Sequence, residues 1–274
     1  MAWDLEPSIR PLIRTPRMFV GDWRCPGERR PWAQETSPGF EVEFPRAGMH
    51  LRSIAGRRTV VDPRRFLVHQ PGEAYLMASP SGRPQRSTIL RLTEEGLAAF
   101  GIRPGSGSFR IPPATALLHA ALLAEPDPLG AEELACALLA RALRQAAAPP
   151  EARASGIAGS PRERRLAADL EEAIASRFTE RLTLDELART CGTSPFHASR
   201  VFRAVTGTTI HRQVTEARLR AALLALRRDA GRLSTLALDL GFCSHSHFTL
   251  AFRKEYGCSP SAWLARAAPS RAAR

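Results

Sequence analysis

The sequence predicts a two-domain α+β protein, with a β-rich N-terminal domain and an all-helical C-terminal domain. Short segments separated by proline and glycine run from residue 40 to residue 92, a pattern typical of a small β-sandwich or barrel. Alanine- and leucine-rich segments with helical periodicity follow, up to residue 145. One helix-turn-helix pattern then occurs twice between residues 182 and 263. A chain of 274 residues has room for both domains.

The N-terminal domain begins with a proline-rich stretch, residues 1–39, which we predict to be an irregular lead-in. From Phe40 onward apolar residues alternate with Glu41 and Glu43, as in a half-buried strand that ends at Pro45. Further strands are predicted at residues 49–54, 59–61, 66–69, 74–77 and 87–92.

The pattern becomes helical after the last strand, and helices are predicted at residues 94–100, 114–124 and 131–145. The last two are rich in leucine. Alanine, proline, glycine and serine without periodicity predict a linker, and Ser160 can cap the helix after it. The predicted divisions are a β-rich domain with appended helices at 1–145, a linker at 146–160 and a helical domain at 161–274.

The C-terminal domain contains one structural unit twice. Residues 194–203 reappear at an offset of 50 as residues 244–253, and each copy is followed by a glycine, Gly207 or Gly257. The segments before them match at an offset of 49, so the one-residue difference falls in a turn, where insertions are tolerated. The pattern therefore indicates a duplication.

Residues that favour helix ends stand at the boundaries of each unit. Thr183 with Glu186 forms a capping box at the first start, and Ser194 can cap the second helix. The two glycines suit the left-handed conformation at helix C-termini. Between the units, residues 209–228 have apolar side chains every three to four positions, which we interpret as a connector helix packed between two similar lobes.

Two helix-turn-helix units on one connector are typical of a bipartite DNA reader, because two recognition helices about one helical turn apart can enter successive major grooves. The charge distribution agrees with this. Residues 161–274 carry 19 Arg and Lys against 11 Asp and Glu, whereas residues 1–160 carry 20 against 16. Only Lys254 is a lysine, so the arginine content partly reflects compositional bias, but most of the net charge of +12 lies where phosphates are expected.

Residues 165–265 resemble the AraC family of transcriptional regulators. The most specific part is LGFCSHSHF at 240–248, followed by AFR at 251–253, Gly257 and the Ser259-Pro260 pair. Turn residues between 44 and 75 are similar to those of the cupin-like sensor domains that precede such DNA-binding domains. The resemblance implies that residues 161–274 are a DNA-binding domain with double-stranded promoter DNA as its partner. It implies that residues 1–145 are a sensor or dimerisation domain, which binds a small-molecule effector and forms a homodimer through its leucine-rich helices; the alternative is that these helices only cover the barrel. For an activator, the resemblance also implies contact with RNA polymerase.

The resemblance also places Phe196, Ser199 and Arg200 on the groove-facing side of the first recognition helix. Arginine can bond guanine bidentately, and an aromatic edge can contact a thymine methyl group. The alternatives are a phosphate contact or a solvated charge for Arg200, and a core position for Phe196. Leu250 stands where the family commonly has an arginine, so the second lobe is expected to bind more weakly or to read shape and a methyl group. The predicted DNA-contacting residues are Phe196, His197, Ser199, Arg200, Arg203, His245, Ser246, His247, Thr249 and Arg253.

A cupin-like barrel also supports a competing hypothesis, a metal-dependent enzyme with an attached DNA-binding domain. The strands offer only His50 and His69, with Glu73 and Cys25 as further ligands and no His-x-His pair. His245 and His247, two residues apart on a helix, point to different sides and do not form a ligand pair. We therefore predict no enzyme, no metal and no cofactor. A third hypothesis gives the N-terminal domain only a dimerisation role.

The remaining features concern location. The five cysteines are scattered and form neither a disulfide framework nor a CxxC metal site. No apolar run approaches the roughly 20 residues needed to span a bilayer. Asp4 and Glu6, without an apolar segment after them, are not typical of a signal peptide. We expect a cytoplasmic protein with no membrane partner.

Overall fold

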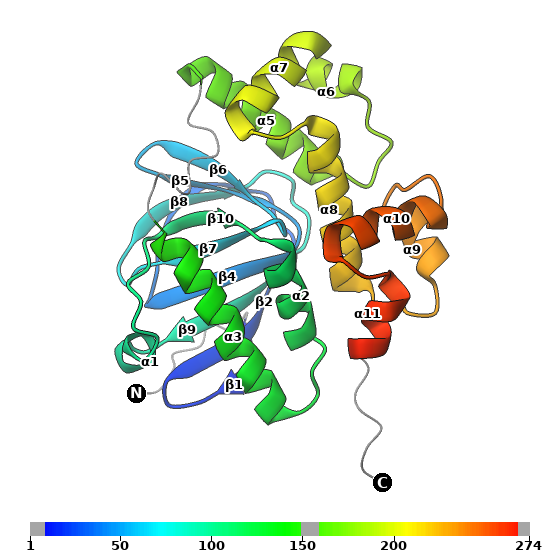
Figure 1. Ribbon diagram of the computed structural model, residues 1–274. Helices are drawn as coiled ribbons and strands as arrows, with labels where there is room; N and C mark the ends of the chain where they lie inside the picture. The colour runs from blue at the N-terminus through cyan, green and yellow to red at the C-terminus, as the bar shows by residue number, and fades with distance from the viewer. Residues whose placement is uncertain (1–8, 149–158, 268–274) are drawn as a thin grey trace.

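The N-terminal part is a sandwich of two antiparallel sheets, and the C-terminal part is a group of helices docked against it (Figure 1). The computed structural model describes residues 9–148 and 159–267. Within these residues, one sheet has the strand order β1-β2-β9-β4-β7-β10 and the other has the order β3-β8-β5-β6. The strands are β1 (Ile9–Arg14), β2 (Met18–Cys25), β3 (Arg30–Thr36), β4 (Phe40–Ala47), β5 (His50–Ile54), β6 (Arg57–Val61), β7 (Arg65–His69), β8 (Ala74–Ser79), β9 (Gln85–Leu92) and β10 (Gly107–Arg110). The predicted two-domain α+β class is confirmed.

Among the described residues, the N-terminal part has the helices α1 (Glu94–Ala98), α2 (Pro113–Leu122) and α3 (Pro128–Ala147). Helix α3 covers the six-stranded sheet, where Leu138, Leu139 and Leu143 are completely buried in one cluster with strand residues such as Val42 and Phe44. Leu139 and Leu143 are four positions apart and Leu138 lies next to Leu139, so a single helical face meets the sheet. Helix α2 packs beside α3 (Figure 1).

Strand β4 is buried on both faces, so the prediction of a half-buried strand is wrong. Its phenylalanine and valine side chains face α3, whereas Glu41 and Glu43 face the second sheet. Glu41 accepts a hydrogen bond from Arg91 at 2.7 Å and Glu43 accepts one from Ser87 at 2.6 Å. Pro45 does not end the strand, because pairing with β7 has already stopped at Glu43 and no ladder bond is lost there.

The prediction of an irregular lead-in before residue 40 is also wrong, because the described part of that stretch forms β1, β2 and β3. Neither β2 nor β3 shows a polar–apolar alternation. The first five residues of β2 are all buried, including Phe19 and Val20, whereas β3 is almost entirely exposed at a sheet edge. A strand with both faces in the same environment carries no period-two signal.

The C-terminal part consists of two lobes joined by the connector helix α8 (Ile210–Ala225) (Figure 1). The first lobe contains α5 (Pro161–Arg177), α6 (Leu184–Thr190) and α7 (Pro195–Thr206), and the second contains α9 (Leu233–Asp239), α10 (His245–Tyr256) and α11 (Pro260–Ala267). The predicted capping box between Thr183 and Glu186 is present, and Ser160 forms another with Glu163. Gly207 and Gly257 have the expected left-handed conformation, with φ of 71° and 77°.

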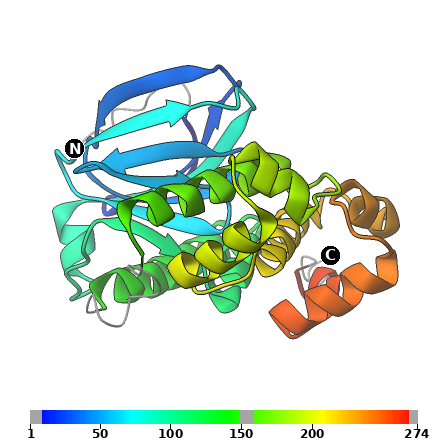
Figure 2. The same cartoon turned by 90° about the horizontal axis from the view of Figure 1, so that it is seen from above.

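Both lobes are docked on the sandwich. Helix α5 lies across the outer face of the four-stranded sheet, where Ala175 joins the buried residues Leu51 and Val60 (Figure 2). Arg58 of β6 bonds the carboxylates of α5, with Asp169 at 3.4 Å. Helix α2 packs against α8 and α10 of the second lobe. Most of the predicted linker at 146–160 lies outside the described residues.

Candidate nucleic-acid interface

Helix α7, the first recognition helix, is held by one apolar face. Its N-cap Ser194 accepts a hydrogen bond from the backbone N–H of His197 at 3.3 Å. Ala198, Val201 and Phe202 are completely buried in the lobe, whereas Phe196 is 80% exposed. Phe196 therefore lies on the outward face, as the family resemblance indicates, and the alternative of Phe196 as a core residue is excluded.

The outward face of α7 carries the other side chains predicted to contact DNA. Ser199, Arg200 and Arg203 are exposed, while His197 is half-buried. Arg200 donates a hydrogen bond to Nδ1 of His197 at 3.3 Å, and its guanidinium lies 4.0 Å from the carboxylate of Glu163. Both partners are solvent-accessible, and contacts of this kind contribute little to stability. The Arg200 guanidinium can therefore exchange them for a nucleic-acid partner.

Helix α10, the second recognition helix, repeats this design. Its N-cap Ser244 accepts a hydrogen bond from the backbone N–H of His247 at 3.1 Å. Phe248 and Phe252 are completely buried, and Leu250 is 70% exposed. The predicted contacts His245, Ser246, His247 and Arg253 are all exposed.

Thr249 is placed differently from the prediction, which assigned it to the exposed face. The residue is half-buried, and its hydroxyl oxygen is buried with no hydrogen-bond partner in the described parts of the chain. Phe252 and Tyr256 follow Thr249 at three and seven positions, a spacing that keeps all three on one helical face. Thr249 thus lies at the edge of the core-facing stripe of α10 and is poorly available to DNA.

The two histidines of α10 have separate surroundings. His247 lies 3.1 Å from the sulfur of Cys243 through Nδ1 and contacts the ring of Phe242, whereas the ring of His245 is nearest to that of Phe248. Across residues 9–148 and 159–267, no group of three or more His, Cys, Asp or Glu side chains is arranged to hold a metal ion.

His50 and His69, the candidate metal ligands of the sandwich, lie buried between the sheets. Nδ1 of His69 accepts from Arg52 at 3.2 Å, and Nε2 of His69 is 3.7 Å from the Glu43 carboxylate. Burial lowers the pKa of His50, so this imidazole is neutral near pH 7. Glu73 is linked to His69 through Arg52, with which it forms an ion pair at 3.0 Å. Cys25 is buried at the end of β2.

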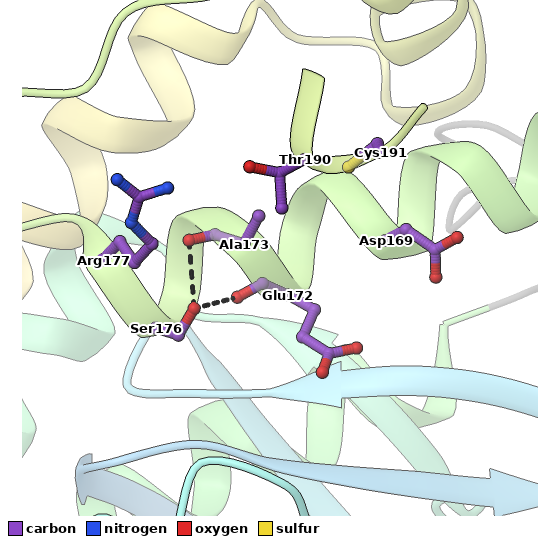
Figure 3. Close-up of a pocket in the computed structure, with 7 residues that line it drawn as sticks. All are labelled: Asp169, Glu172, Ala173, Ser176, Arg177, Thr190 and Cys191. Atoms are coloured by element: carbon purple, nitrogen blue, oxygen red, sulfur yellow. Dashed lines mark hydrogen bonds between the residues drawn. The ribbon is translucent and has the colours of Figure 1, made fainter. Parts of the chain in front are cut away.

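A pocket of about 370 Å³ lies between α5 and the end of α6 (Figure 3). Asp169, Glu172 and Cys191 line it, together with Ser176, whose hydroxyl donates to the backbone carbonyls of the preceding turn. Burial, and then the two nearby carboxylates, raises the pKa of the Cys191 thiol above its ordinary value. The pocket therefore holds no activated nucleophile, and its acidic rim does not suit phosphates.

The arrangement of α7, α8 and α10 defines a double helix-turn-helix DNA-binding protein. A family model described as a helix-turn-helix domain matches residues 187–266. The regulatory protein SoxS of Salmonella typhimurium is 33% identical over 92 residues, which is 34% of this chain and 86% of SoxS. The bifunctional transcriptional activator/DNA repair enzyme AdaA of Bacillus subtilis is 32% identical over 92 residues, and this match spans only 44% of AdaA. The chain belongs to the AraC family of DNA-binding transcriptional regulators.

Solved structures similar to this one match different shares of the chain. ToxT from Vibrio cholerae, with a bound unsaturated fatty acid, is 8% identical with a TM-score of 0.39, over 91% of this chain and 95% of ToxT. A probable AraC family regulator from Rhodopseudomonas palustris is 26% identical with a TM-score of 0.36, over 38% of this chain and 99% of that one. No helix of the described residues is long and apolar enough to cross a membrane.

Proposed function

We propose that this regulator binds promoter DNA sequence-specifically by placing the exposed faces of α7 and α10 in two successive major-groove segments. The observation that carries the proposal is the matched pair of helices, each with a serine N-cap and a left-handed glycine C-cap, on the single connector α8. A recognition helix reads bases from its N-terminal turns. The exposed residues of α7 and α10 start at those turns, with Phe196 and His245.

The first lobe is proposed to carry most of the base recognition. Arg200 can bond O6 and N7 of a guanine bidentately, and the exposed ring of Phe196 can contact a thymine methyl group. In the second lobe the position equivalent to Arg200 is Leu250, which has no donor. Polar contacts there are left to His245, Ser246, His247 and Arg253, while the Leu250 side chain can meet a methyl group.

The N-terminal domain is proposed to bind a small polar effector between its sheets, as the family resemblance implies. Among the described residues, one buried nitrogen there, Nε of Arg52, has no hydrogen-bond partner, and Nε2 of His69 has the Glu43 carboxylate only at 3.7 Å, beyond hydrogen-bond distance. Buried polar atoms normally find a partner, and oxygen atoms of a ligand would supply one.

Homodimerisation is proposed through the outer face of α3. Helix α2, the other helix expected at a dimer interface, is occupied by the second lobe. The middle of this face exposes Glu133, Cys136, Ala137, Arg141 and Arg144, and Leu129 is exposed in the first turn. Antiparallel packing of two copies would bring Glu133 of each helix near Arg144 of the other, and the small central residues would allow close approach.

The regulator is proposed to act as an activator that contacts RNA polymerase. Its proposed domain divisions are a sensor or dimerisation domain at residues 1–145, a linker at 146–160 and a DNA-binding domain at 161–274. The direct test is sequencing of genomic fragments bound by the purified full chain, followed by fluorescence anisotropy on the enriched sequence. We expect one recurrent two-part motif, and an affinity whose logarithm falls linearly with the logarithm of salt concentration. Retention of random fragments only, or an affinity independent of salt, would contradict the proposal.

A further inference from the structure

Helix α2 lies between the β-sandwich and the second lobe, and His119 is its central contact. The imidazole is completely buried and is bonded on both sides. Nε2 lies 2.9 Å from the hydroxyl of Thr88 in β9, and Nδ1 lies 2.6 Å from the guanidinium of Arg220 in α8. The ring also packs against Phe44 of β4, with centroids 4.9 Å apart. One side chain therefore touches two strands of the sandwich and the connector of the DNA-binding lobes.

The bonding pattern requires a neutral His119 in one tautomer. A guanidinium only donates hydrogen bonds, so Nδ1 must accept from Arg220 and Nε2 must carry the proton that it donates to Thr88. Burial, and then the charge of Arg220, holds the pKa of His119 well below its ordinary value. The imidazole is thus fixed in orientation by partners on two different parts of the molecule.

Arg220 depends on these neutral acceptors. It also donates to the backbone carbonyls of Pro63, at 2.9 Å, and of Ala116, at 3.1 Å. Within the described residues it forms no ion pair with a carboxylate, and burial lowers its pKa to about 10. Because a buried cation without a counter-charge has a large desolvation cost, loss of one acceptor weakens the docking of α8 on α2.

The adjoining face of α2 packs into the second lobe itself. Ala116 and Ala120 belong to one buried apolar cluster with Leu223 of α8 and with Phe248 and Phe252 of α10. The two alanines therefore pack on the buried side of the second recognition helix. The buried cluster of the first lobe is built within residues 166–214 and contains no α2 residue in the described chain.

We propose that α2 couples the β-sandwich to the second lobe alone, with His119 as the positioning residue that links Thr88 to Arg220. A change in packing around Thr88 or Phe44 then alters the anchoring of α10, while α7 is anchored separately through α5 and the four-stranded sheet. The coupling requires no effector and does not rest on the proposed effector site.

The test is amide hydrogen exchange on the full chain, followed in α10 (His245–Tyr256) and in α7 (Pro195–Thr206). His119→Leu removes the acceptor for Arg220, so exchange in α10 should increase about tenfold while exchange in α7 stays unchanged. His119→Gln keeps an amide oxygen for Arg220 and an amide N–H for Thr88, and should restore most of the protection. Arg110→Gln removes an exposed partner of Glu216 at the same domain interface and is the matched control.

Equal effects on both recognition helices, or no effect on α10, would overturn the proposal. Failure of His119→Gln to protect α10 better than His119→Leu would also overturn it, since packing alone would then explain the change. If His119→Leu does not fold, Thr88→Val decides the matter, because it removes only the hydroxyl on the far side of His119. Faster exchange confined to α2 and α10 supports the coupling, and unchanged exchange in α10 refutes it.

Discussion

Replacing Phe202 or Phe252 by alanine tests whether each ring fills the core of its own lobe, as the structure shows. Phe202 and Phe252 occupy equivalent positions in the duplicated unit, and both are completely buried. A buried Phe→Ala change costs about 3–5 kcal/mol through lost burial and the cavity left behind. The ring of Phe252 also packs against Phe248 and Tyr256, with centroids 5.7 and 4.6 Å away. Because each such ring pair contributes roughly 0.5–1.5 kcal/mol, Phe252→Ala should lie at the upper end of the range.

The assay combines urea unfolding of the full chain, followed by circular dichroism, with anisotropy on target DNA. Stability of a domain is only about 5–15 kcal/mol, so both changes should lower the unfolding midpoint clearly and weaken DNA binding indirectly. Phe196→Ala is the matched control, since it makes the same chemical change on the helix of Phe202 at a side chain that is 80% exposed. It should leave unfolding within about 0.5 kcal/mol of wild type and weaken DNA binding directly. Unchanged unfolding of Phe202→Ala and Phe252→Ala would refute this account of the lobes.

Three further predictions concern DNA, pH and assembly. Arg200→Ala should weaken operator binding by about 1–3 kcal/mol and relax base choice, while Leu250→Ala should cost less; the reverse order in anisotropy titrations would make the second lobe dominant. Burial raises the pKa of the Asp62 carboxyl, but its ion pair with Arg64 outweighs this and holds the pKa below the ordinary value. The stability that this ion pair contributes is present above about pH 4 and is lost as the pH falls further. The difference in urea midpoint between wild type and Asp62→Asn should therefore shrink on acidification. A difference that stays constant with pH would contradict the assignment. Glu133→Arg should reduce dimerisation measured by light scattering, and adding Arg144→Glu to the same chain should restore it. If neither change alters dimerisation, α3 is not the dimer interface.

The features predicted well from sequence are those whose physical cause is local. The capping box of Thr183 and Glu186, the serine N-cap at Ser194 and the left-handed glycine at Gly207 each involve residues within a few positions of one another. The buried faces of α7 and α10 follow from helical periodicity in the same way. The duplication adds a second, independent copy of each signal.

The features missed depend on contacts between distant segments. Glu41 and Glu43 look like surface residues until the strand is placed between α3 and a second sheet, where Arg91 and Ser87 satisfy them. Strand β2 is buried on both sides for a similar reason, so it lacks an alternating pattern. Thr249 could have been assigned correctly, because its spacing from Phe252 and Tyr256 already indicates the core side. No sequence signal joins His119 to Arg220, which are 101 residues apart.

The position of α2 limits how freely the DNA-binding half could be exchanged between proteins. In SoxS the matched segment makes up 86% of the chain, so that protein consists almost entirely of the region shared with this one. Here Ala116 and Ala120 cover Leu219 and Leu223 of the connector helix, and Arg220 depends on acceptors outside the lobes. A fusion of residues 161–274 to an unrelated sensor would expose this apolar strip and leave a cation without its acceptors. The two lobes therefore depend on packing outside residues 161–274, and in a chimera cut at the linker they should unfold at a lower urea concentration than in the full chain.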